Sequence, residues 1–150
     1  GNIKDAVAVD GFAGTVACGL EALSRGASHC YFIDSSEQAF ELIRQNLQAT
    51  GLDDQGIVLR GTFRSQIKLI DETPDLWFLD PPFEEDLIGD ALKAMTLSSA
   101  VTERALAVVK QDKRDDIEEV RPFEIEDNRV YGRNRLLFYR YLPDESPKDT

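Results

Sequence analysis

Short apolar runs alternate along the chain with segments in which apolar residues recur at helical spacing. The runs hold three to five residues, as buried strands do, and span 6–9, 30–33, 57–59, 76–79 and 105–109. The helical segments span 20–26, 39–47, 62–72 and 87–95. Strands that alternate with helices in this way predict a mostly parallel sheet built from β-α-β units.

Helix boundaries in this pattern carry recognisable end signals. Ser35 with Gln38 has the spacing of a capping box at the start of the second helix, and Gly51 is placed to end it. The acidic residues 84–86 precede the fourth helix, where negative charge interacts favourably with the helix dipole.

The pattern changes after residue 120. Residues 123–126 alternate with period two and 135–142 form a second strand-like run, with a predicted loop over 127–132. This predicts an antiparallel hairpin at the sheet edge. The expected fold class is α/β, a doubly wound, mostly parallel sheet with an antiparallel C-terminal hairpin. One domain over 1–143 is predicted, followed by a polar, disordered tail over 144–150.

Composition agrees with a single soluble globular domain, at 150 residues, 42% apolar and 30% charged. No apolar run approaches the roughly 20 residues of a membrane span, and residues 1–5 show no signal-peptide pattern. Cys18 and Cys30 are predicted to be buried free thiols, which favours a reducing, cytoplasmic location, and two cysteines are too few for a structural zinc site. His29 is expected in a solvated loop, and no bound metal is predicted.

The net charge of −11 is unusual for a protein that binds nucleic acid, since phosphate binding normally requires a basic patch. Basic residues gather late, at Arg129, Arg133, Arg135 and Arg140. They could form a local basic rim or a solvated strand face, and the sequence favours neither.

A small-residue turn follows the first predicted strand. Asp10 ends that strand, residues 11–19 contain three glycines, and a helix begins next. Strand, glycine-rich turn and helix form the start of a nucleotide-binding β-α-β unit. Asp34 ends the second strand twenty positions after Gly14, where an acid can hold a ribose hydroxyl pair.

A second motif, Asp80-Pro81-Pro82-Phe83, follows the fourth strand. In open α/β sheets, ligands bind beyond the carboxyl ends of the strands. Asp80 and the Pro81 carbonyl can accept hydrogen bonds from an exocyclic amine, and Phe83 can stack on a flat base. Neither proline donates an N–H, and their fixed φ stiffens the loop.

These motifs resemble the class I S-adenosylmethionine-dependent methyltransferases, whose fold is Rossmann-like. More narrowly, Phe12-Ala13-Gly14-Thr15, residues 19–27, Asp80-Pro81-Pro82-Phe83 and Tyr131-Gly132 with 136–139 are similar to the bacterial RsmD-like family, which methylates a guanine N2 in small-subunit ribosomal RNA. The resemblance implies that Asp80, Pro81, Pro82 and Phe83 bind the target amine and base. It implies an S-adenosylmethionine pocket built from Asp10, Phe12, Ala13, Gly14, Asp34 and Thr62, and ribosomal RNA or the small ribosomal subunit as partner.

The chain departs from this family at two positions. Val16 stands where the family has glycine, and Thr62 stands where the family usually has an aspartate that contacts the adenine amine. A hydroxyl could partly substitute for that carboxylate. Two alternatives therefore stay open: an adenine-N6 DNA methyltransferase, and a non-catalytic domain with lost or weakened cofactor binding.

Overall fold

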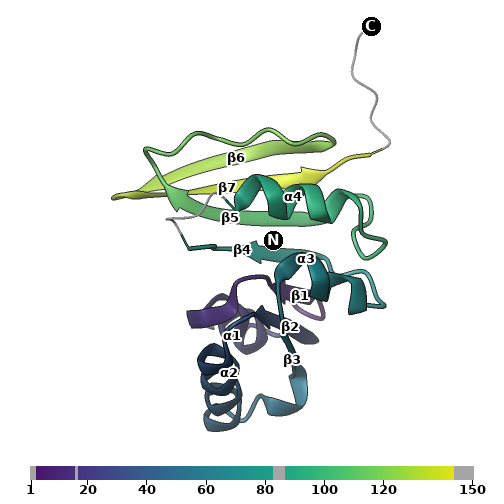
Figure 1. Cartoon of the computed structure of the whole chain (residues 1–150), viewed down its shortest axis with the longest axis vertical. Coiled ribbons are helices and arrows are strands. Elements are labelled where there is room, and N and C mark those ends of the chain that lie inside the picture. The colour runs from purple at the N-terminus through teal and green to yellow at the C-terminus, as the bar shows by residue number, and fades with distance from the viewer. Residues whose placement is uncertain (1–2, 16, 83–86, 144–150) are drawn as a thin grey trace, which may run out of the picture.

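The computed structural model describes residues 3–15, 17–82 and 87–143, in which seven strands form one sheet in the order β3-β2-β1-β4-β5-β7-β6 (Figure 1). Strands β1 to β5 pair in parallel, and β7 runs antiparallel to both β5 and β6. The predicted fold class is therefore confirmed. The strands are β1 (Val7–Asp10), β2 (His29–Asp34), β3 (Gly56–Arg60), β4 (Leu76–Leu79), β5 (Leu106–Asp112), β6 (Phe123–Tyr131) and β7 (Asn134–Tyr141).

Helices connect the parallel strands, with bounds α1 (Ala17–Ser24), α2 (Glu37–Ala49), α3 (Phe63–Gln66) and α4 (Ile88–Thr96), and short 3-10 turns η1 (Ala13–Thr15), η2 (Asp53–Gln55) and η3 (Ile67–Leu69). The predicted capping box is wrong by one residue, because the side chain of Ser36 accepts from the Ala39 N–H at 3.2 Å. The helix predicted over 62–72 ends earlier, at Leu69, because Ile70 turns to extended backbone and is buried in the core.

Alternate residues of each inner strand face opposite sides of the sheet, and each side has its own core. Trp77, Leu92 and Met95 lie in the core on the side of α3 and α4, and Phe32 and Ile43 lie in the core on the side of α1 and α2. Figure 1 shows α1 and α2 beside the β1–β3 half of the sheet and α4 beside β5. This doubly wound arrangement brings the carboxyl ends of the parallel strands to one edge.

The C-terminal hairpin is longer than predicted. Asp127 to Tyr131 belong to β6, so the loop predicted over 127–132 is wrong, and only Gly132 and Arg133 separate the two strands. Gly132 has a φ of 56°, the left-handed conformation that tight hairpin turns require. The strand β6 lies at the sheet edge and is largely exposed, so its residues need not follow an apolar alternation.

The structure corrects two expectations, the burial of Cys18 and the loop position of His29. Cys18 is exposed rather than buried, whereas Cys30 is buried, and both are free thiols. His29 is the first residue of β2 rather than a loop residue, and its Nε2 lies 2.7 Å from the Glu72 carboxylate. Among the described helices, none combines the length and apolar character needed to cross a bilayer. The predicted tail over 144–150 lies outside the described residues.

Candidate functional site

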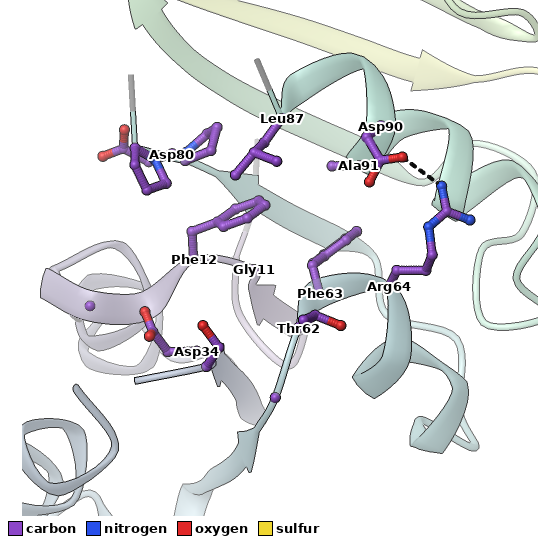
Figure 2. Close-up of a pocket in the computed structure, with 15 residues that line it drawn as sticks. Gly11, Phe12, Asp34, Thr62, Phe63, Arg64, Asp80, Leu87, Asp90 and Ala91 are labelled. Atoms are coloured by element: carbon purple, nitrogen blue, oxygen red, sulfur yellow. Dashed lines mark hydrogen bonds and ion pairs between the residues drawn. The ribbon is translucent and has the colours of Figure 1, made fainter. Parts of the chain in front are cut away.

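A cavity of about 740 Å³ lies beyond the carboxyl ends of β1, β2, β3 and β4 (Figure 2). Its size is that of a small-molecule or cofactor site. It is lined by Gly11, Phe12, Gly14, Asp34, Ser35, Gly61, Thr62, Phe63, Arg64, Asp80, Pro81, Pro82, Leu87, Asp90 and Ala91.

Seven predicted site residues line the cavity: four from the first three strand ends, and all three described residues of the Asp-Pro-Pro motif. They are Phe12, Gly14, Asp34, Thr62, Asp80, Pro81 and Pro82. Phe83 and Val16 lie outside the described residues.

Asp10 and Ala13 are not among the lining residues, although both were predicted to bind the cofactor. Ala13 is fully buried, and Asp10 is only 5% exposed. The Asp10 Oδ2 accepts a hydrogen bond from the Gly19 N–H at 3.0 Å. The pKa of Asp10 is raised to about 6, chiefly by burial and also by the nearby carboxylates of Asp80 and Asp34, against the lowering effect of that hydrogen bond. Asp10 therefore ties the turn to the start of α1.

Gly14 and Asp34 form one wall of the cavity. A Cβ atom at Gly14 would lie 3.3 Å from the Asp34 Oδ2, so the missing side chain keeps that oxygen accessible. The Asp34 Oδ1 accepts from the Ser36 N–H at 2.9 Å, which fixes the carboxylate at the start of α2. One oxygen is thus held by the backbone, and the other is available to a ligand.

Thr62 and Phe63 follow the end of β3. Thr62 caps α3, since its Oγ1 accepts from the Ser65 N–H at 3.2 Å and lies 2.9 Å from the Ser65 Oγ. The Phe63 ring stacks on Phe12, with centroids 5.5 Å apart and planes inclined by 17°. A Cβ atom at Gly11 would lie 2.7 Å from the Phe63 ring, so the glycine makes room for it.

Asp80 lies at the end of β4, beside Lys110 on β5, whose Nζ is 3.9 Å from the Asp80 Oδ2. Burial raises the pKa of Asp80, and the Lys110 ammonium opposes that increase. Figure 2 shows Phe12 and Phe63 between Asp34 and Thr62 on one side and Asp80 and Leu87 on the other. The two predicted groups of site residues therefore face one aromatic pair.

Sequence reasoning missed eight lining residues as members of a site. Arg64 and Asp90 form an ion pair of 2.7 Å that joins α3 to α4 at the cavity (Figure 2). Phe63 could have been found, because it directly follows the end of the third strand, but the ion pair joins segments far apart in sequence. The eight are Gly11, Ser35, Gly61, Phe63, Arg64, Leu87, Asp90 and Ala91.

The residues present fit a nucleoside cofactor. Aromatic rings can contact a base, the free Asp34 oxygen can accept from ribose hydroxyls, and Gly14 leaves space beside that oxygen. Within the described part of the chain, no group of three or more His, Cys, Asp or Glu side chains could hold a metal ion.

Strand order, antiparallel hairpin and site position together define a class I methyltransferase domain. The chain belongs to the RsmD-like family, because the model of the family described as conserved hypothetical protein 95 matches residues 1–140. The YlbH protein of Bacillus subtilis is 26% identical over 136 residues, covering 88% of this chain and 74% of that protein. Ribosomal RNA small subunit methyltransferase D of Haemophilus influenzae is 30% identical over 114 residues, covering 74% of this chain and 59% of that protein.

The fold similarity extends to a solved structure. The yhhF protein of Escherichia coli superposes with a TM-score of 0.84 at 26% identity, covering 93% of this chain and 79% of that one.

Proposed function

We propose that this chain transfers a methyl group from S-adenosylmethionine to the exocyclic N2 amine of a guanine in small-subunit ribosomal RNA. One observation carries the proposal: Asp80, Pro81 and Pro82 line the same cavity as Gly14 and Asp34. An amine acceptor and a nucleoside cofactor would therefore meet in one site. The methyltransferase names of relatives such as the Haemophilus protein support the reaction class and the RNA substrate.

The cofactor half of the site would use the β1, β2 and β3 ends. Asp34 would accept hydrogen bonds from the ribose hydroxyls, and Phe63 would offer its ring to the adenine. Asp10, buried beneath, would hold the turn through Gly19 rather than contact the ligand directly. S-adenosylmethionine would supply an electrophilic methyl group.

The acceptor half would use Asp80 and the Pro81 carbonyl. A guanine amino lone pair is delocalised into the ring, so the amine is a poor nucleophile. Two acceptors that hold its hydrogens out of the ring plane would localise the lone pair on nitrogen and aim it at the methyl carbon. The nitrogen then carries one proton too many, which Asp80 or water could take up. A paired guanine would have to flip out of its helix to reach the site.

Calorimetry with S-adenosylmethionine is the first test, followed by transfer of labelled methyl groups to ribosomal RNA. Mass spectrometry of the digested nucleosides separates N2-methylguanosine from N6-methyladenine. Absence of cofactor binding would support the non-catalytic alternative. Methyl groups on adenine in DNA would support the adenine-N6 DNA methyltransferase.

A further inference from the structure

The far end of the sheet from β3 gathers positive charge in an otherwise acidic chain. Residues 128–143 contain four arginines and no Asp or Glu, although the chain has a net charge of −11. These residues form the end of β6, the tight turn and β7. The charge is therefore concentrated on one structural unit.

Hydrogen bonds bring three of the cations together. The Lys113 N–H donates to the Arg133 carbonyl at 2.9 Å, and the Arg135 guanidinium donates to the Lys113 carbonyl. None of the ion pairs found among the described residues includes Lys113, Arg133 or Arg135. Among the described residues, Arg133 lies near enough to the Asp112 carboxylate to lower its pKa, but no ion-pair contact holds any of the three.

Acidic residues nearby leave an excess of positive charge. Asp112 is held by Arg114 through bonds of 3.0 and 2.9 Å, and Arg114 and then Arg133 keep the pKa of Asp112 well below its usual range. Asp115 and Asp116 follow in the next turn and are exposed. Arg114 is thus paired with Asp112, whereas Lys113 and Arg133 are exposed to solvent.

This charge lies on the same edge as the cavity. Asp112, the last residue of β5, pairs with Asn134, so the β6–β7 turn lies at the carboxyl end of β5. Figure 1 shows that turn reaching past the end of β5. Lys110, two residues before Asp112, approaches Asp80 to 3.9 Å and links the two regions.

An exposed aromatic residue adjoins the cations. Tyr131, the last residue of β6, is 55% exposed and directly precedes the turn. Cations that contact phosphates, together with an exposed ring on which a base can stack, are the two features of surfaces that bind single-stranded nucleic acid.

We infer that Lys110, Lys113, Tyr131 and Arg133, the basic turn surface, bind the RNA acceptor beside its target base. The cations contact backbone phosphates and Tyr131 stacks on an unpaired base. This inference rests on the proposed function, because it assigns the acceptor RNA a docking surface next to Asp80. RNA is favoured over an acidic protein because the exposed aromatic ring adjoins the cations.

The test measures binding of a labelled small-subunit ribosomal RNA fragment by anisotropy over a range of salt concentrations. The double variant Lys113→Glu with Arg133→Glu should bind roughly 10- to 50-fold more weakly near 0.1 M salt, and its salt slope should fall by about 1.4–1.8. The matched control is Lys68→Glu with Arg25→Glu, which carries the same net charge and changes residues outside this surface. Tyr131→Ala should weaken binding about 5-fold or more, whereas Tyr131→Phe should not.

Affinity for S-adenosylmethionine should be unchanged in every variant. Equal RNA binding by the double variant and its control would contradict RNA binding at the basic turn surface. Competition by a polyglutamate peptide as strong as that by unlabelled RNA would also contradict it. If the unmodified chain binds the cofactor and methylates RNA while the double variant binds RNA normally, only the surface is wrong. If the unmodified chain binds RNA through these residues but transfers no methyl group, the proposed function is wrong and the surface stands.

Discussion

The Asp10 carboxylate and the Gly19 N–H form a buried hydrogen bond of 3.0 Å across the turn between β1 and α1. A carboxylate in this position is held by the backbone and yet poorly solvated. Its raised pKa, about 6, follows first from that burial. The turn that shapes the cavity is thus anchored by a group whose charge is unfavourable in the folded state.

Asp10→Asn should therefore stabilise the protein at high pH. The pKa of Asp10 is raised on folding from 3.8 to about 6, so its favourable contribution is present below pH 4 and is lost as the pH rises through 6. An asparagine oxygen can still accept from Gly19 and carries no charge. The gain in unfolding free energy at pH 8 should reach roughly 3 kcal/mol and vanish near pH 4. Urea titrations at both pH values measure it.

The control for that experiment is Asp75→Asn. The Asp75 Oδ2 also accepts from a backbone N–H, that of Val7, but Asp75 is exposed. A pH-dependent gain of equal size in both variants would show that burial of Asp10 is not its cause.

Asp34→Ala should weaken the binding of S-adenosylmethionine and of S-adenosylhomocysteine to the same extent, because both molecules carry the same ribose. Loss of the hydrogen bonds to this carboxylate should reduce the binding free energy of each ligand by about 1.5–3 kcal/mol, measured by calorimetry. Ser36→Ala is the control, since it removes the α2 cap at a cost of about 1 kcal/mol in stability and leaves Asp34 in place. Loss of affinity for the methylated form alone would contradict the ribose assignment.

Asp80→Asn should reduce methyl transfer about 100-fold or more while cofactor affinity and melting temperature stay near their original values. The carboxylate would be replaced by a group of similar shape that is a weaker acceptor and cannot take up a proton. Transfer of labelled methyl groups and thermal unfolding are measured together, with Asp71→Asn as a variant of equal charge change. A destabilised Asp80→Asn protein with near-normal transfer would argue for a structural role.

Lys110→Met should move the acidic limb of the pH–rate profile to higher pH. Burial raises the pKa of Asp80 and Lys110 opposes this, so removing the cation raises that pKa further and activity is lost earlier as the pH falls. Both side chains are partly exposed, so solvent screening keeps this shift small. The measurement is kcat at saturating RNA across the acidic range, and Lys110→Arg should keep the original profile.

The sequence by itself determined the parallel core of the fold and the strand-end positions of the site. Buried strands flanked by helices need short apolar runs, and these runs are visible without any long-range information. Because ligands bind at the carboxyl ends of such strands, Asp34 and Asp80 could be assigned to one site from their positions after two of the runs.

Only the tertiary structure decided which side chains meet. Asp10 ends β1 as predicted, yet it turns beneath the cavity to bond Gly19, and local sequence does not show that burial. The Arg64–Asp90 and Lys110–Asp80 pairs join segments far apart in the chain. The second half of β6, Asp127 to Tyr131, was predicted as a loop because a strand exposed to solvent needs no apolar alternation. Its pairing with β7 is specified by backbone hydrogen bonds that leave no pattern in the sequence.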